Sequence, residues 1–288
     1  MTRNIVVKGY QIHHEIESVG FRNIYSALHL KTGKEVFITL ISLGLGRDFE
    51  LLKKRAKMSR MLKNPSLLTA IDCGVLAGDR FFYTHASLAS LPIMRRLEEI
   101  TDKTEALFTT VAYFIDALEA LDFIHEADVC HRDLSTNQIR VTPKDKILLE
   151  GFINARPKLE LRNIANMVFL PYMAAEQLLG APVDMKTDIY SMGIILYELL
   201  TGKLPYDSNY SKIESMHKGI CPSARVLREE LPIELDNILM RSLSPRKTRY
   251  PYVREWINDL EEFYDKRSFR MKMREVSSSV KNLFAAKS

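Results

Sequence analysis

The chain lacks the long apolar run of a membrane-spanning helix, which needs on the order of eighteen consecutive apolar residues. Its first residues also lack the apolar core of a secretory signal peptide. Cysteine is scarce: Cys73, Cys130 and Cys221 are scattered and show no metal-ligand spacing. An odd number of scattered cysteines is typical of reduced thiols, so these features together predict a cytoplasmic protein.

A strong overall charge is also lacking, because the net charge is only +5 over 288 residues. Residues 267–288 hold six basic side chains and one acidic side chain, so the rest of the chain is near neutral in sum. This distribution argues against nucleic-acid binding by the main body. The length suits one two-lobed domain or two small domains.

The pattern of apolar residues divides the chain into two parts. Residues 5–42 alternate like an antiparallel meander, residues 48–63 have helical spacing, and two further strand-like runs follow at 67–76 and 80–88. Beyond them, residues 104–127 predict a long amphipathic helix, and residues 187–202 predict a helix that is buried on nearly every side. A small strand-rich lobe followed by a larger helical lobe is therefore expected.

Four sequence motifs follow one another along these two predicted lobes. They are HRDL at 131–134, YMAAEQ at 172–177, TDIYSMGIILYELLTGKLPYD at 187–207 and RYPYVREWINDLEEF at 249–263. Together they resemble the landmarks of bacterial Ser/Thr protein kinases over about residues 10–265. The resemblance implies an α+β bilobal fold: an N-lobe at 1–86 with an antiparallel five-stranded sheet and one helix, a mainly helical C-lobe at 87–266, and a basic amphipathic tail at 267–288.

The residues that match the family best are structural ones. In the family, an aspartate like Asp188 caps the central helix and accepts hydrogen bonds from the backbone of the catalytic loop. A glutamate like Glu176 forms a buried ion pair with an arginine like Arg249. Their retention implies that the scaffold folds as a kinase does.

Phosphoryl transfer needs a glycine loop over the phosphates, a lysine on the third strand, a partner glutamate, metal ligands and a base. By the resemblance, Glu17, Val19 and Arg22 stand at the glycine positions, and Thr39 stands at the lysine position. A carboxylate about 4 Å from a phosphate charge costs roughly 4 kcal/mol at an effective dielectric of 20. Phe37 stands in the roof of the adenine pocket, where it either fills the space of adenine or points into the lobe core.

The remaining chemical positions are also changed. Arg55 stands at the helix glutamate, Ser135 at the catalytic-loop lysine, and Gln138 and Leu149 at the two metal ligands. Asp133, the base position, is kept together with His131 and Arg132. A shift of one residue would make Glu150 the acidic ligand, paired with Asn137. Two further residues are counted with the cleft, Arg140 beneath the adenine position and Thr84.

These replacements predict a pseudokinase without a cofactor that acts through a protein partner. The alternative is an atypical transferase that uses ATP and magnesium through Asp133, Glu150 and either Asn137 or Gln138. A third idea is a non-nucleotide ligand contacted by Glu17, Arg22, Arg55 and Arg140. Residues 152–171 contain no serine, threonine or tyrosine, which favours a constitutively shaped surface.

The tail at 267–288 is the second interaction candidate. Apolar residues recur there at helical spacing between basic ones, at Phe269, Met273, Val276, Val280 and Leu283. This stripe suits docking on a partner, a homodimer through a coiled coil, or contact with an anionic membrane. Packing against its own lobe is the alternative.

Overall fold

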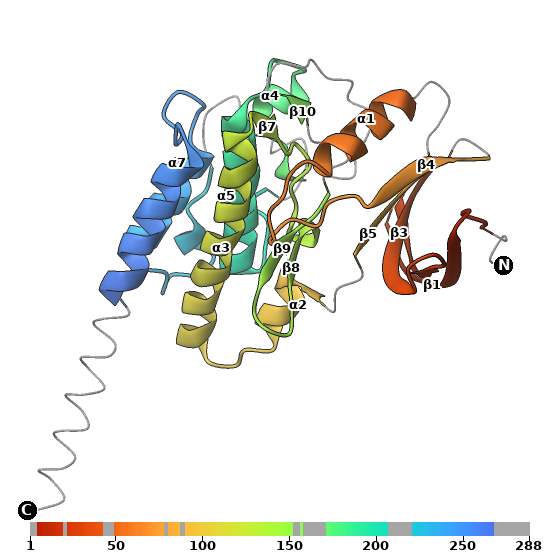
Figure 1. The fold of residues 1–288 in the computed structure, drawn as a ribbon. Coiled ribbons are helices and arrows are strands. Elements are labelled where there is room, and N and C mark those ends of the chain that lie inside the picture. The colour runs from red at the N-terminus through yellow and green to blue at the C-terminus, as the bar shows by residue number, and fades with distance from the viewer. Residues whose placement is uncertain are drawn as a thin grey trace, which may run out of the picture.

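The computed structural model describes residues 5–19, 22–42, 49–77, 80–86, 90–151, 156–157, 171–206 and 221–267. Figure 1 shows a strand-rich part that holds the N-terminal residues and a helical part that holds most of the remaining chain. The first part contains a five-stranded antiparallel sheet and one helix, and the second is mainly helical. The predicted α+β bilobal fold is therefore confirmed.

The sheet of the first lobe has the strand order β1-β2-β3-β5-β4. Its strands are β1 Tyr10–Val19, β2 Arg22–His29, β3 Lys34–Ser42, β4 Asp72–Leu76 and β5 Arg80–Ala86. Two hairpins in sequence join β1 to β2 and β2 to β3, where Val19 pairs with Arg22 and His29 pairs with Lys34. Because β4 follows β5 in the order, β4 is an edge strand.

The two faces of this sheet differ, since successive side chains of a strand point to opposite sides. One face is buried in an apolar cluster that includes Tyr25, Val36, Ile38, Leu40 and Phe82. Helix α1, Phe49–Ser59, covers part of the other face. Two of its residues, Leu52 and Ala56, pack there with Phe81 and Tyr83 of β5. We call this second face the α1 face.

The segment that follows α1 joins the sheet to the helical lobe. Leu68 N donates to Leu149 O, and Leu149 N donates to Ser66 O, each at 2.8 Å. Leu62 and Leu67 are buried in the core of the helical lobe. These contacts fix the end of α1 against the second lobe.

The helical lobe is organised around the two long helices α3 and α5. Its helices are α2 Ile93–Glu98, α3 Lys103–Glu126, α4 Ala175–Leu178, α5 Met185–Thr201 and α7 Ile233–Leu243, followed by helical residues 253–267. Its short strands are β6 Leu91–Pro92, β7 Val129–Cys130, β8 Ile139–Val141, β9 Ile147–Leu149 and β10 Arg156–Pro157. β6, β8 and β9 form one small sheet, and β10 pairs with β7. Figure 1 shows α3 and α5 side by side at the centre of this lobe.

Helix α5 begins at a different aspartate from the one that the sequence suggested. Asp184 is its N-cap and accepts a hydrogen bond from Lys186 N at 3.0 Å. The prediction that Asp188 caps this helix is therefore wrong, because Asp188 lies within the first turn. Its carboxylate is directed instead to the catalytic loop, as described below.

Helix α5 approaches α7 closely at a glycine. A methyl group on Gly193 would overlap Ser242 Oγ and would lie 2.7 Å from Leu243 Cδ2. A residue without a side chain is therefore needed where these two helices touch. The apolar pattern predicted the burial of α5, and this glycine explains how α7 comes so near.

Two predicted segments lie largely outside the described residues. They are the tail at 267–288, of which only Arg267 is described, and the segment 152–171, of which Arg156, Pro157 and Pro171 are described. Among the described residues, no helix has both the length and the apolar character that crossing a membrane requires.

Candidate functional site

The motif HRDL opens a loop between β7 and β8, which we call the catalytic-loop segment, residues 131–138. Asp188 holds its first residues: the carboxylate accepts hydrogen bonds from His131 N and from Arg132 N, each at 2.7 Å. His125 Nε2 binds the same carboxylate at 2.9 Å. Arg132 has a φ of 67°, a left-handed backbone conformation that is costly for residues other than glycine. Asp188 thus stabilises a strained turn.

The environment of Asp188 keeps its carboxylate ionised. Burial opposes ionisation, but the hydrogen bond and charge of His125, with the backbone N–H of Arg132, outweigh it and hold the pKa of Asp188 below its ordinary value. Because the group is fully buried, its charge is balanced only by these donors. The predicted hydrogen bonds that the loop backbone donates to Asp188 are confirmed.

His131 anchors the other side of the loop. Its Nε2 donates to Glu150 O at 2.8 Å, and its Nδ1 accepts from Asp133 N at 3.4 Å. This arrangement suits a neutral ring. Burial lowers the pKa of His131 below its ordinary value, and the charge of Asp188 only partly opposes that effect.

Stability is expected to fall as the pH drops below about 6.5, in part because of His131. The unfolded ring takes up a proton below about pH 6.5, whereas the folded ring stays neutral to lower pH. The contribution of His131 is therefore present above about pH 6.5 and is lost as the pH falls, by at most about 1.4 kcal/mol per pH unit. Urea unfolding of His131→Asn should show a flatter profile, and His13→Asn, an exposed control, should not. An unchanged slope in His131→Asn would contradict this assignment.

The hairpin of β8 and β9 decides which acidic residue faces the loop. Ile139 pairs with Leu149, and Glu150 N donates to Gln138 O at 2.9 Å. Leu149 is fully buried in the apolar core of the helical lobe. The placement of Leu149 at the metal-ligand position is therefore corrected, because Glu150 is the residue that lies next to Gln138.

The amide residue beside Glu150 also differs from Asn137, which the one-residue shift in the sequence suggested. Asn137 is exposed, whereas Gln138 is fully buried. Both polar atoms of the Gln138 side chain have no hydrogen-bond partner among the described residues. This side chain lies against Gly151, where a Cβ would come within 2.8 Å of Gln138 Nε2 and the φ of 96° favours glycine. Gln138 and Glu150, rather than Asn137 and Glu150, form the neighbouring pair.

The lysine position lies on the α1 face of the sheet. Thr39 is fully buried there, pairs with Tyr83 across β5, and its hydroxyl has no hydrogen-bond partner among the described residues. Phe37 lies on the same face, half-buried, because it alternates with the core residues of β3. Its ring meets that of His85 edge to face at 5.6 Å. Phe37 therefore points away from the apolar cluster on the opposite face.

Thr84 does not line this face, contrary to the prediction. It pairs with Ile38, which points to the opposite side, and its hydroxyl contacts Tyr10 Oη and accepts from Asp72 N. The residues that accompany Phe37 and Thr39 are Tyr83 and His85, which the sequence reading missed. The alternation of residues 80–86 and 34–42 shows which side chains of each strand share a face, so pairing the two strands would have placed Tyr83 and His85 beside Phe37 and Thr39.

The other cleft candidates are only partly placed. Arg55 is buried on α1, which agrees with a position that faces inward, whereas Glu17 is half-buried in β1. Val19 and Arg22 pair at the end of the first hairpin, and their side chains lie outside the described part. The structure thus does not gather all the predicted contacts of a non-nucleotide ligand into one cluster.

Arg140 lies on the side of β8 that faces away from the core, since Ile139 and Val141 are both buried in the core. Its guanidinium donates to Ser90 Oγ and to Ser90 O, each at 2.9 Å. A cation therefore occupies the position where the resemblance implied an apolar floor. It is tied to the segment that connects the two lobes.

The predicted buried ion pair of the helical lobe is present. Arg249 Nη1 lies 2.9 Å from Glu176 Oε1 and also donates to Lys186 O at 2.7 Å. Thr187 Oγ1 donates to the same carboxylate oxygen at 3.0 Å. These contacts fix α4 and the chain before the last helix to the start of α5.

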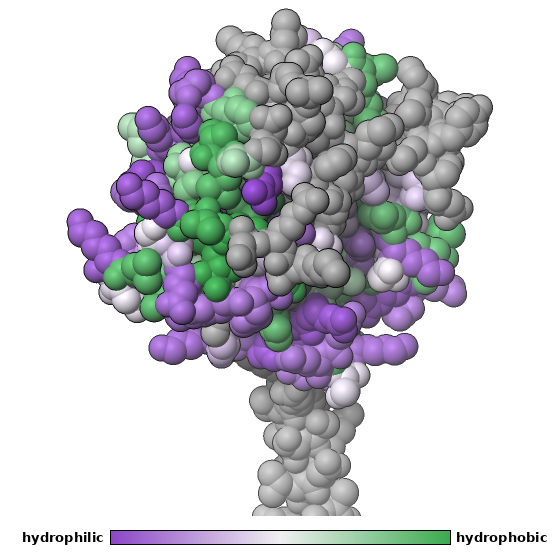
Figure 2. Space-filling model, turned by 90° about the vertical axis from the view of Figure 1, so that its right-hand side faces the viewer, coloured by the Kyte–Doolittle hydropathy of each residue, from purple (hydrophilic) through white to green (hydrophobic). Residues whose placement is uncertain are grey.

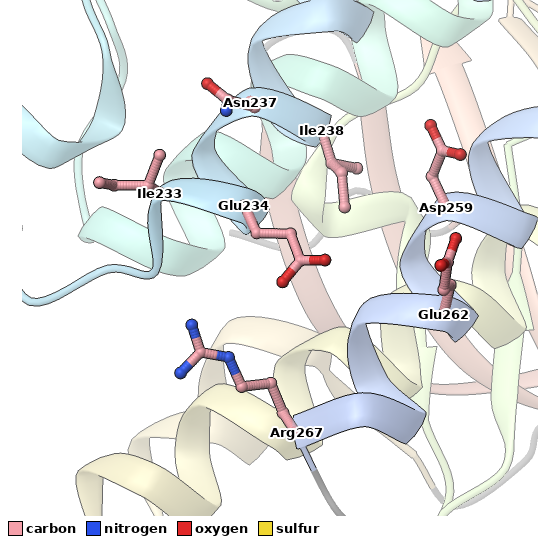
Figure 3. Close-up of a pocket in the computed structure, with 7 residues that line it drawn as sticks. All are labelled: Ile233, Glu234, Asn237, Ile238, Asp259, Glu262 and Arg267. Carbon is pink, nitrogen blue, oxygen red and sulfur yellow. The ribbon is translucent and has the colours of Figure 1, made fainter. Parts of the chain in front are cut away.

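A groove lies elsewhere on the helical lobe, between α7 and helical residues 253–267. Its volume is about 620 Å³, and Figure 3 shows Glu234 and Arg267 extending into it from the two helices. Lys266 pairs with Glu234 at 3.9 Å and with Glu262 at 2.5 Å. Because the carboxylates of Glu234 and Glu262 are already paired, the groove offers little charge to a ligand. None of the predicted site residues lines it.

The bilobal fold and the catalytic-loop segment held by Asp188 define a domain of the protein kinase type. The family profile described as protein kinase domain matches residues 20–283. The chain therefore belongs to the protein kinase family.

Curated relatives support the same family. The chain is 28% identical over 284 residues to the probable serine/threonine-protein kinase CA_C1728 of Clostridium acetobutylicum, covering 91% of this chain and 43% of that protein. It is 26% identical over 272 residues to the serine/threonine-protein kinase PknB of Mycobacterium tuberculosis, covering 87% and 42%. The chain thus spans less than half the length of these relatives.

Solved structures show the same fold. The kinase domain of Mycobacterium tuberculosis PknI superimposes with a TM-score of 0.69 at 20% identity, covering 91% of this chain and 99% of that one. The autoinhibited serine kinase domain of the muscle protein titin gives 0.73 at 21% identity, covering 90% and 82%. At such identities the likeness shows the fold alone.

The prediction that the chain takes no cofactor is wrong. The chain belongs to the protein kinase family and its relatives are named serine/threonine kinases, which use ATP with magnesium. The residues present fit the metal, because Gln138 and Glu150, whose backbones are hydrogen-bonded, carry an amide oxygen and a carboxylate, and magnesium prefers oxygen ligands. The fit to the phosphates is poorer, since the resemblance aligns the uncharged Thr39 and Ser135 with two lysines of the family.

Proposed function

We propose that this chain is a pseudokinase, a kinase-fold domain with phosphoryl transfer lost or strongly reduced, which acts by binding a protein partner. The position of Thr39 carries the proposal. The resemblance aligns Thr39 with the family's phosphate-binding lysine, and in the structure its hydroxyl is fully buried beside Tyr83 of β5. Phosphoryl transfer depends mainly on positioning and on neutralising charge, and a threonine supplies no charge.

The contrast between scaffold and chemistry supports this proposal. Asp188 still holds the catalytic-loop segment, and Glu176 still pairs with Arg249. Thr39 and Ser135, by contrast, replace cations. A scaffold that is kept while the chemical groups change is what a binding module requires.

The test is a transfer assay with labelled ATP, magnesium or manganese, and a mixed Ser/Thr peptide library. We expect equal, background incorporation of phosphate by the unaltered protein and by Asp133→Asn. Asp128→Asn, the same change at an exposed residue nearby, is the matched control. Transfer that falls at least about tenfold in Asp133→Asn but not in Asp128→Asn would overturn the proposal. Nucleotide binding without transfer would leave it standing.

One observation favours a second candidate, an atypical phosphotransferase. Gln138 and Glu150 are neighbours, His131 of the catalytic-loop segment binds Glu150 O, and the buried Gln138 amide has no hydrogen-bond partner among the described residues. An amide oxygen beside a carboxylate can bind magnesium. Transfer abolished by Asp133→Asn in the assay above would support this candidate.

The partner surfaces suggested by the sequence stay predictions. A homodimer or an anionic membrane contact through residues 267–288 concerns side chains that lie outside the described part of the chain. Nucleic acid is not expected as a partner.

A further inference from the structure

Helix α1 and the turn after it carry an unbalanced positive charge. Residues 51–71 contain six basic side chains and no acidic one. Arg55 is buried, and Lys53 pairs with Glu50 at 2.7 Å. The other four are exposed and form no ion pair with any described residue. We call these four the basic face: Lys54, Lys57, Arg60 and Lys63.

This arrangement costs the helix stability. Lys54 and Lys57 stand about one turn apart on α1, and like charges one turn apart destabilise a helix by about 0.2–0.5 kcal/mol per pair. Elsewhere in the described chain exposed arginines have acidic partners, as Arg95 has Glu98, whereas exposed lysines such as Lys31 do not, so the contrast concerns Arg60. A merely solvated helix gains from charges of both signs. The missing countercharge points to another molecule.

Apolar side chains border the basic face. Met61 is 79% exposed in the turn after α1. Ile71, just before the edge strand β4, is 43% exposed, and Val75 within that strand is 41% exposed. Side chains two residues apart in a strand point to the same face of the sheet. Cys73 packs against the cluster that contains Leu52 and Ala56 of α1. Ile71 and Val75, two residues before and after it, therefore also lie on the α1 face.

The cations reach this apolar border. Burial and the negative charge of the adjacent Asp72 raise the pKa of the Cys73 thiol, while the positive charges of Arg60, Lys57 and Lys53 act in the opposite direction and are therefore near it. Figure 2 views the molecule from the side where the N-terminal sheet lies and shows hydrophobic and hydrophilic side chains next to one another on this face. The surface thus combines unpaired positive charge with exposed apolar groups.

We propose that the basic face, with Met61, Ile71 and Val75 beside it, binds an acidic segment of a partner protein that carries apolar residues between its carboxylates. This inference rests on the proposed function, because it names the surface through which the pseudokinase binds. Carboxylates would relieve the repulsion along α1, and apolar side chains would cover the border.

A membrane fits this surface less well than a protein does. A helix that lies in a membrane interface needs a continuous apolar face, whereas the exposed apolar groups here are few and lie partly on an edge strand. The last described helix, which leads to the second basic segment, ends at the opposite side of the molecule from α1 in Figure 1.

The test uses a fluorescein-labelled synthetic peptide of glutamate and leucine, and the same peptide with glutamine in place of glutamate. Fluorescence anisotropy should show binding of the glutamate peptide only, weaker at higher salt. The triple variant Lys54→Glu, Lys57→Glu, Arg60→Glu should lose at least about tenfold in affinity, since each removed attraction becomes a repulsion. The matched control Lys8→Glu, Lys31→Glu, Lys34→Glu changes the net charge equally at exposed residues of the same lobe and should lose less than about twofold.

Three results would overturn the docking proposal. The first is that the unaltered protein does not bind the glutamate peptide, and the second is that both triple variants lose the same affinity for it. The third is that the protein binds only phosphatidylserine vesicles and that the triple variant of the basic face abolishes this binding. A neutral triple variant, with glutamine at the same three positions, guards against misfolding and should weaken binding to an intermediate degree. Failure of peptide binding leaves the transfer assay unaffected, so the two proposals fail separately.

Discussion

Replacing Arg249 by alanine is expected to lower the free energy of unfolding by about 3–5 kcal/mol, because the change leaves the Glu176 carboxylate buried without its cation. The lost arginine also holds the backbone through Lys186 O and Ser244 O, and its guanidinium lies 4.9 Å from the centre of the Tyr190 ring. Chemical unfolding followed by tryptophan fluorescence measures the loss. The single Trp256 is fully buried, so it reports on this lobe.

The control for this prediction is three residues away. Arg246 pairs with Asp184 at 2.6 Å, but its side chain is 42% exposed. Exposed ion pairs contribute about 0–1 kcal/mol, so Arg246→Ala should change stability little. A similar loss in both variants would show that burial of the Glu176 pair does not set its importance.

Replacing Asp188 by alanine is expected to lower the free energy of unfolding by about 3–6 kcal/mol. The change removes the acceptor of two backbone N–H groups and of His125, and each buried polar group left without a partner costs about 1–3 kcal/mol. Asp188→Asn keeps one acceptor oxygen and should lose less. Asp184→Ala, which removes the cap of the same helix, should cost only about 0.5–2 kcal/mol.

The same group has a signature in acid. Because the pKa of Asp188 is lowered in the folded state, its stabilisation is present above its unfolded pKa near 3.9 and is lost as the pH falls through the lower folded value. Unfolding measured between about pH 5 and pH 3 should therefore show a smaller decline in Asp188→Asn than in the unaltered protein. An equal decline in both would mean that other carboxylates cause the acid sensitivity.

Much of the fold could be predicted because its signals are local. The alternation of 34–42 predicted β3, and the spacing of 104–127 predicted α3, which the structure gives as Lys34–Ser42 and Lys103–Glu126. Helix α1 ends at Ser59, earlier than the predicted 63, because the chain turns there to join the second lobe through Leu67 and Leu68. Such an end is set by tertiary contact rather than by propensity.

The site was predicted less completely, because a shift of one residue in a strand moves each side chain to the other face. That shift separates Leu149, which is buried in the core, from Glu150, which adjoins Gln138. It also separates Thr84 from the residues beside Phe37, which are Tyr83 and His85. A single sequence does not contain the register of two paired strands.

The sequence by itself determined that this chain folds as a protein kinase does, and it aligned Thr39 and Ser135 with two lysine positions of the family. These properties follow from which residues are present and from their spacing. The tertiary structure alone decided that Glu150 and Gln138 are neighbours and that the charges of α1 border the exposed residues of the β4 edge. Both depend on contacts between segments distant in the chain, which form only when strands pair and helices pack.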